Sequence, residues 1–221
     1  MLITESLFLL MRRDDGKAEV DISKRHYGLT AAVITDLVIA QRIALSDDKD
    51  PRVTVLVPAP PGHAALDPGM ARLQKRDGTR LSWLVNDTKI AVEDTIARSL
   101  VSAGTIGVEE RRAFGLVPAR YPVIDPGPER RLRERLRAVL HGEVPDPQES
   151  AVLAILQGLG IVEKVLAEEK GDLGKKELEA RIEEVSADVR AGDAVARAVA
   201  AMNAAIMTAV VVPATVSGGG D

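Results

Sequence analysis

Few residues in this chain combine the types and the spacing that catalysis requires. Two pairs of neighbouring carboxylates, Glu93-Asp94 and Glu183-Glu184, come nearest to an acid–base pair. Adjacent side chains on a helix point in different directions, so neither pair can share one substrate, and a solvated surface is the better interpretation. The chain has no cysteine, and the spacing of His26, His63 and His141 does not match that of metal ligands.

The sequence also lacks the short motifs that mark nucleotide-binding loops, hydrolase nucleophiles and zinc proteases. It contains no GxGxxG, no phosphate-binding loop, no GxSxG and no HExxH. We therefore predict a protein that is not an enzyme, with no catalytic residue, no cofactor and no bound metal.

A basic helix face is a better candidate for function. Arg130, Arg133 and Arg137 are spaced i, i+3 and i+7 in a predicted helix over residues 128–141, so they share one outer face. Near an anionic membrane leaflet each arginine contributes roughly 1 kcal/mol to binding. Because Glu129 and Glu134 lie in the same helix, an ordinary solvated face is the alternative.

A hairpin predicted over residues 106–123 carries the second candidate. Its tip region, from Glu109 to Arg120, places Phe114, Leu116 and Val117 between arginines. These side chains either fold back onto the core or enter a membrane interface or a neighbouring subunit. Burying each contributes about 1.5–3 kcal/mol, so membrane attachment through this tip would be weak and would need a second, electrostatic signal.

The composition predicts which elements must position these residues. Of 221 residues, 46% are hydrophobic but only 2% are aromatic, so the core consists of Leu, Val, Ile and Ala, which favours helices. The net charge of −4 argues against a protein that binds nucleic acid through its phosphates. The absence of cysteine favours a cytoplasmic location.

Apolar periodicity predicts a mainly α, compact single domain over residues 1–216, with one or two short β-hairpins and a flexible tail at 217–221. Trp83 is expected to anchor the core. The apolar stretch at 198–216 is expected to be a buried core helix rather than a membrane span. A short strand is expected at 18–20 and a first hairpin at 42–57. Helices are predicted at 28–41, 67–76, 79–86, 90–103, 128–141, 151–159, 161–168 and 175–190, with residues 2–11 forming a helix or strand.

Several segments, taken in order, resemble the Golgi phosphoprotein 3 family over about residues 2–212. The abundance of Ala, Arg, Gly and Val favours a bacterial-type member. The segments that carry the resemblance are LITESLFLL at 2–10, DDG at 14–16, GLTAAVITDL at 28–37, PPG at 60–62, TIARSLVSAG at 95–104 and RYP at 120–122.

The resemblance implies a mostly helical, non-enzymatic protein whose eukaryotic relatives bind phosphatidylinositol 4-phosphate and retain glycosyltransferases as adaptors. In the family an aromatic residue and three arginines hold the headgroup. Here the aromatic position falls near Asp21 and the arginines fall on Thr30, Ile90 and Glu93, so the bidentate donors are lost. Their neighbours in sequence, Lys24, Arg25 and Lys89, are the candidate substitutes.

The first hypothesis is therefore a peripheral membrane protein on the cytosolic face of a membrane, which binds an anionic lipid through a diverged headgroup site. The alternative is an interaction or assembly module that uses the hairpin from Glu109 to Arg120 to contact a second copy or another protein. A winged-helix-like nucleic-acid binder, suggested by two helix–hairpin successions, is the least favoured because the net charge is acidic.

Overall fold

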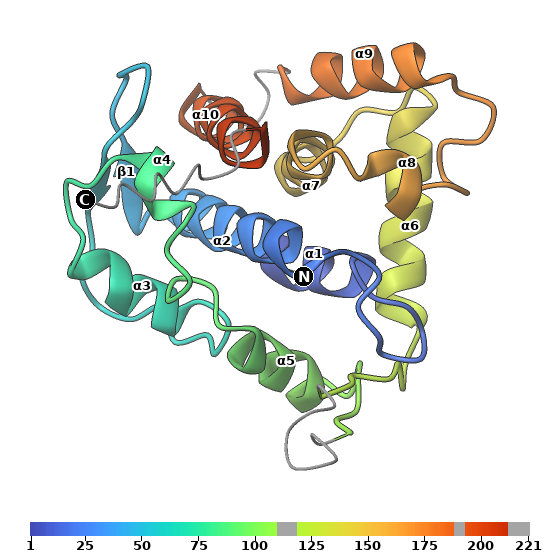
Figure 1. The fold of residues 1–221 in the computed structure, drawn as a ribbon, viewed down its shortest axis with the longest axis horizontal. Coiled ribbons are helices and arrows are strands. Elements are labelled where there is room, and N and C mark those ends of the chain that lie inside the picture. Colours follow the sequence, from blue (N-terminus) through green and yellow to red (C-terminus); the bar gives the residue numbers. More distant parts are fainter. Residues whose placement is uncertain (110–118, 188–192, 212–221) are drawn as a thin grey trace, which may run out of the picture.

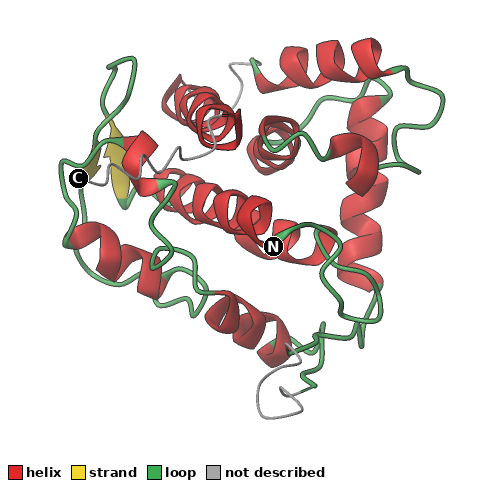
Figure 2. Cartoon of the chain, viewed as in Figure 1, coloured by secondary structure: helices red, strands yellow, loops and turns green. Residues whose placement is uncertain are grey.

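The computed structural model describes residues 1–109, 119–187 and 193–211. Within them the chain forms helices and one two-stranded sheet (Figures 1 and 2), which confirms the predicted mainly α fold. In chain order the elements are α1 (Ile3–Leu10), α2 (Ile22–Ile39), β1 (Ile43–Leu45), β2 (Val53–Val55), α3 (Asp67–Gln74), α4 (Leu81–Leu84), α5 (Glu93–Ser102), α6 (Gly127–Leu140), α7 (Pro147–Gly158), α8 (Val162–Val165), α9 (Lys175–Ser186) and α10 (Asp193–Val211).

Helix α2 is the central element, and α1, α7 and α10 pack around it (Figure 1). Its residues 28–38 are buried without interruption, as expected for a helix that is apolar on more than one side. The helix begins at Ile22, six residues before the predicted start. The reason is a polar cap, because Asp21 Oδ1 accepts a hydrogen bond from the Lys24 backbone N–H at 2.9 Å.

Helix α1 is buried at every residue, although it contains Thr4, Glu5 and Ser6. Its first N–H groups therefore need partners inside the protein. Asp36, in the middle of α2, supplies them: its carboxylate accepts the N–H of Ile3 at 3.0 Å and the N–H and hydroxyl of Thr4 at 2.9 and 2.7 Å. Burial raises the pKa of Asp36, against the opposing effect of these hydrogen bonds.

The first predicted hairpin is confirmed. Strands β1 and β2 pair antiparallel, with Ile43 opposite Val55 and Leu45 opposite Val53. The expected strand at 18–20 is reduced to one isolated bridge between Arg12 and Ala18. The second hairpin is represented by bridges Ile106–Val123 and Glu109–Arg120, and its tip lies outside the described residues.

The prediction that Trp83 anchors the core is wrong. Its exposed fraction is 67%, whereas Leu81 and Leu84 are fully buried. Helix α4 is only four residues long, and these two leucines, three positions apart, occupy its inner face. Trp83 lies on the opposite face for that reason.

The C-terminal helices complete the core. Asp146 caps α7 through a reciprocal pair of hydrogen bonds with Glu149, and Pro147 occupies the first helical position. Helix α10 buries Met202 and Ile206 against α2 and α7, which fits the expected core helix. Of the helices that are described, none has the length and apolar character needed to cross a membrane.

Replacing Asp36 tests the cap of α1. Asp36→Ala leaves two buried N–H groups and one hydroxyl without an acceptor, so we expect the free energy of unfolding to fall by about 3 kcal/mol or more. Asp36→Asn keeps one acceptor oxygen and should lose less. Urea unfolding measures both, with exposed Asp172→Ala as control. A loss below about 1 kcal/mol for Asp36→Ala would contradict this role of the carboxylate.

Candidate functional site

The region predicted to hold a lipid headgroup lies where the first turns of α2 and α5 meet. Arg25 Nε donates to Glu93 Oε1 at 3.2 Å, and its Nη1 donates to the Val20 carbonyl at 2.8 Å. Arg12, from the end of α1, donates from Nη2 to Glu93 Oε2 at 2.6 Å. One carboxylate thus pairs with two guanidinium groups, and Arg25 is already engaged.

Arg12 is a member of this cluster that sequence reasoning missed. Its side chain is 6% exposed and lies 3.6 Å above the centre of the Phe8 ring and 5.3 Å from that of Tyr121. Burial lowers the pKa of Arg12, and the charge of Glu93 opposes that shift. Its partner Glu93 is 81 positions away in the sequence, so no local sequence pattern could predict this ion pair.

The other positions assigned to the headgroup by resemblance lack a cationic donor, and two of them are closed to a ligand. Asp21 caps α2, while Thr30 and Ile90 are fully buried. Of the candidate substitutes beside Arg25, Lys24 is half-buried and Lys89 is exposed. Neither ammonium forms an ion pair with a residue that the structure describes. These two lysines are therefore available to an anionic surface, although they do not form a closed cage.

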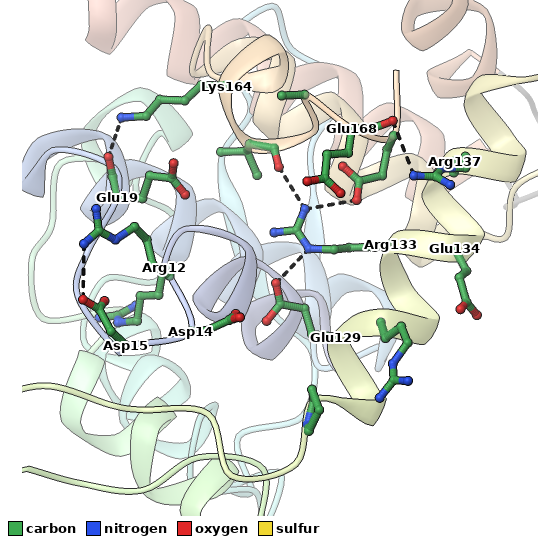
Figure 3. Close-up of a pocket in the computed structure, with 16 residues that line it drawn as sticks. Arg12, Asp14, Asp15, Glu19, Glu129, Arg133, Glu134, Arg137, Lys164 and Glu168 are labelled. Atoms are coloured by element: carbon green, nitrogen blue, oxygen red, sulfur yellow. Dashed lines mark hydrogen bonds and ion pairs between the residues drawn. The ribbon is translucent and has the colours of Figure 1, made fainter. Parts of the chain in front are cut away.

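The predicted basic face of α6 lies along an open hollow of about 810 Å³ (Figure 3), to which Arg130, Arg133 and Arg137 all contribute. Arg133 turns inward, donating from Nε to Glu129 at 2.8 Å and from Nη1 to Glu169 at 3.3 Å. Burial lowers the pKa of Arg133, but Glu129 and then Glu169 raise it on balance. Seven acidic and six basic side chains line the hollow, so it is a mixed surface rather than a positive one.

The apolar hairpin residues Phe114, Leu116 and Val117 lie outside the described residues. The stem is held by the loop between α1 and α2, where Tyr121 N–H donates to the Gly16 carbonyl at 3.3 Å. Gly16 has a φ of 77°, and a Cβ there would meet the Tyr121 backbone at 2.4 Å. Only glycine fits this contact, which fixes the base of the hairpin beside the Arg12 cluster.

Metal binding receives no support from the described part of the chain, where no three His, Asp or Glu side chains gather closely enough to hold an ion. The carboxylates of Glu93 and Asp94 point in different directions, as expected. Glu93 faces the two arginines, whereas Asp94 accepts a hydrogen bond from the Tyr121 hydroxyl at 3.1 Å.

The family model for Golgi phosphoprotein 3 (GPP34) matches residues 2–202. The chain belongs to this family. No curated protein matches it. Membership of the Golgi phosphoprotein 3 family agrees with the resemblance carried by residues 2–10, 28–37 and 95–104, which form α1, the buried part of α2 and α5.

Removing the charge of Glu93 should convert the Arg12–Arg25 cluster into an anion site. Glu93→Gln leaves two cations without a counter-charge, so we expect a loss of about 2–3 kcal/mol in the free energy of unfolding. Inorganic phosphate should restore part of that loss, because an anion can bridge both guanidinium groups. Thermal unfolding in phosphate and in chloride of equal ionic strength measures this, with exposed Glu183→Gln as control. An identical phosphate response in all three proteins would contradict it.

Tyr121 provides a pH-dependent test of the same cluster. Burial, followed by the charge of Asp94, raises the pKa of Tyr121 to about 12. Because this value exceeds that of an unfolded tyrosine, about 10, the phenol stabilises the fold below pH 10, and the contribution is lost as the pH rises through about 12. Ultraviolet titration should show one tyrosine with this high pKa, absent in Tyr121→Phe but retained in Tyr27→Phe. Retention in Tyr121→Phe would refute the assignment.

Proposed function

We propose that this protein is a non-enzymatic peripheral membrane protein that docks reversibly on anionic lipid surfaces without selecting a phosphoinositide. The observation that carries the proposal is the exposure of two large apolar side chains, Ile22 at the start of α2 and Trp83 in α4, on segments that also carry two unpaired lysines, Lys24 and Lys89. Their exposed fractions are 73% for Ile22 and 67% for Trp83.

One contact joins the two segments that carry these side chains, the start of α2 and the residues after α4. The His26 ring lies within hydrogen-bonding reach of the Asn86 backbone. Ile22 and Lys24 occupy the turn of α2 before His26, and Trp83 and Lys89 each lie three positions from Asn86. In the proposal, the apolar side chains enter the lipid interface and the ammonium groups meet lipid phosphates.

Energetics favour weak and reversible binding. Each lysine near an anionic leaflet contributes about 1 kcal/mol. Partial burial of the two apolar side chains adds about 1.5–3 kcal/mol each at most. Tryptophan suits the interface because its ring is apolar and its indole N–H can reach water or a headgroup. Additional insertion by Phe114, Leu116 and Val117 would strengthen attachment.

Selectivity for phosphatidylinositol 4-phosphate is not part of the proposal. A phosphomonoester is held best by several fixed guanidinium groups. In this protein Glu93 occupies the guanidinium groups of Arg12 and Arg25, and an incoming phosphate would meet its negative charge. Binding should therefore follow the surface charge of the membrane rather than the identity of the headgroup.

The second candidate, an assembly module, is favoured by apolar residues at the hairpin stem. Val108 is 51% exposed and Ile124 is 67% exposed, and both lie on the base side of the Glu109–Arg120 bridge. Such side chains can form the centre of a contact between two copies of the chain or with another protein. Lipid binding would then be dispensable.

Flotation with liposomes tests the first function. The vesicles contain phosphatidylcholine alone, with phosphatidylglycerol, or with phosphatidylinositol 4-phosphate at matched charge. We expect flotation with both anionic mixtures and not with phosphatidylcholine. Ile22→Ala/Trp83→Ala and Lys24→Glu/Lys89→Glu should each lose most of it, whereas Leu56→Ala, which removes a side chain that is 54% exposed elsewhere, should not.

Two results would decide against this proposal. Equal flotation of all variants would show that the surface around Trp83 does not contact lipid, and Phe114→Ala/Leu116→Ala would then report on the hairpin. Absence of flotation with every lipid, together with a dimer in sedimentation that Ile124→Asp dissociates, would favour the assembly module instead.

A further inference from the structure

One histidine side chain lies in the contact between α2 and the segment that follows α4. His26 is near the start of α2, and its ring lies within hydrogen-bonding reach of the Asn86 backbone. The segment around Asn86 is folded by short-range hydrogen bonds, in which the N–H groups of Asp87 and Ile90 donate to the carbonyl groups of Leu84 and Asp87 at 2.9 and 3.1 Å. The His26 ring therefore connects two segments that are far apart in the sequence.

One ring nitrogen of His26 has no partner in this contact. Its Nε2 atom is shielded from solvent and forms no hydrogen bond with the part of the chain that the structure describes. A neutral imidazole has one N–H donor and one acceptor nitrogen, whereas the protonated ring has two N–H donors. In the protonated ring Nε2 carries an N–H that has no acceptor, which costs free energy, as does burial of the charge. The contact therefore fits the neutral ring.

The carboxylate of Asp87 acts on the charge of His26 but is already occupied. Its Oδ2 accepts from Arg72 Nε at 2.8 Å, and Arg76 Nε lies 3.9 Å from the same oxygen. Its Oδ1 accepts the Lys89 N–H at 3.1 Å. Asp87 therefore cannot turn toward the His26 ring without giving up these partners.

Glu93 is the second carboxylate whose charge acts on His26. Both of its oxygens are held by arginines, since Oε2 accepts from Arg12 at 2.6 Å and Oε1 accepts from Arg25 at 3.2 Å. These two guanidinium groups offset much of the attraction that Glu93 would exert on a protonated ring. The carboxylates near His26 are thus paired with other cations, and the protonated ring would have none of its own.

The net effect of these surroundings is to disfavour the charged ring. Burial lowers the pKa of His26, and the Asn86 backbone and the charges of Asp87 and Glu93 oppose that shift only in part. Because the folded pKa lies below that of an unfolded histidine, about 6.5, the neutral ring stabilises the fold above that pH. This stabilisation is lost as the pH falls from about 6.5 through the lower folded value.

We propose that protonation of His26 in mild acid releases the segment around Asn86 from the start of α2, so that the contact acts as a pH-sensitive switch. The release brings the charged ring into water, where both of its N–H groups find acceptors. Since Ile22 and Lys24 precede His26 and Lys89 follows Asn86, mild acid would also loosen the surface assigned to lipid. Only this last consequence rests on the proposed function, because the release itself takes place without lipid.

Hydrogen exchange of the full chain, measured without lipid, tests the release. Between about pH 7.5 and pH 5, the protection factors of the Asp87 and Ile90 amides should fall by about fivefold or more. Protection factors are compared because they remove the intrinsic pH dependence of exchange. The amides of Leu153 and Ile155 in α7, which are buried far from any described histidine contact in the sequence, should keep their protection. No loss at Asp87 and Ile90, or an equal loss in α7, would overturn a local switch.

The variant His26→Asn assigns the response to this ring. Asparagine keeps a short polar side chain but has no proton to gain, so protection around Asn86 should be the same at both pH values. His63→Asn is the matched control: its side chain is 39% exposed and lies 3.6 Å from Glu5, and the variant should respond to acid as the unchanged protein does. A pH response that persists in His26→Asn would refute the assignment.

A second measurement needs no variant of His26 and remains decisive if His26→Asn does not fold. Nuclear magnetic resonance of the imidazole groups gives each histidine its own titration curve, and His63→Asn and His141→Asn identify the other two signals. The remaining signal should titrate below the ordinary value of about 6.5. Titration of His26 at or above that value would show that the contact accepts the charged ring, and the proposal would fail.

Discussion

The carboxylate of Asp36 is the interaction on which the arrangement of the helices depends. It lies inside the core, 4% exposed, and satisfies the first turn of a helix that water cannot reach. That helix, α1, contacts α2, α5, α6 and α7, so its position sets the spacing of the elements around it. Glu5 extends the same polar network by accepting the Leu2 N–H and the Ser99 hydroxyl, which ties α1 to α5. The apolar core is thus organised around a few fully bonded polar groups.

Charge pairing inside the protein also determines which surfaces remain for ligands. Glu93 occupies Arg12 and Arg25, and Glu129 and Glu169 occupy part of Arg133. The arginines Arg12, Arg25 and Arg133 therefore have structural roles. Lys24, Lys89 and Arg130 remain unpaired among the described residues. Under the proposed function, binding therefore depends on diffuse charge and exposed apolar side chains rather than on fixed guanidinium groups.

Helices with a periodic apolar stripe could be predicted from the sequence. Contacts between residues that are far apart in the sequence could not. The stripes of α5 and α9 repeat at helical spacing, so both helices were predicted within a few residues of their observed bounds. The start of α2 was missed because a single cap at Asp21 extends it through polar residues. Exposure of Trp83 depends on which face of a four-residue helix meets the core. The Arg12–Glu93 and Arg133–Glu169 pairs join residues 81 and 36 positions apart, and only the tertiary fold brings them together.

The burial of α1 also has a consequence for the order in which the chain folds during synthesis. An isolated helix of eight residues is unstable in water, and the cap of α1 is supplied by a residue made about thirty positions later. Helix α7, which covers it, is complete only at Gly158. At translation rates of about 5–20 residues per second, the apolar residues of α1 stay uncovered for roughly ten seconds or more. Helix α1 is therefore protected only after the helix that covers it has been made, more than a hundred residues later.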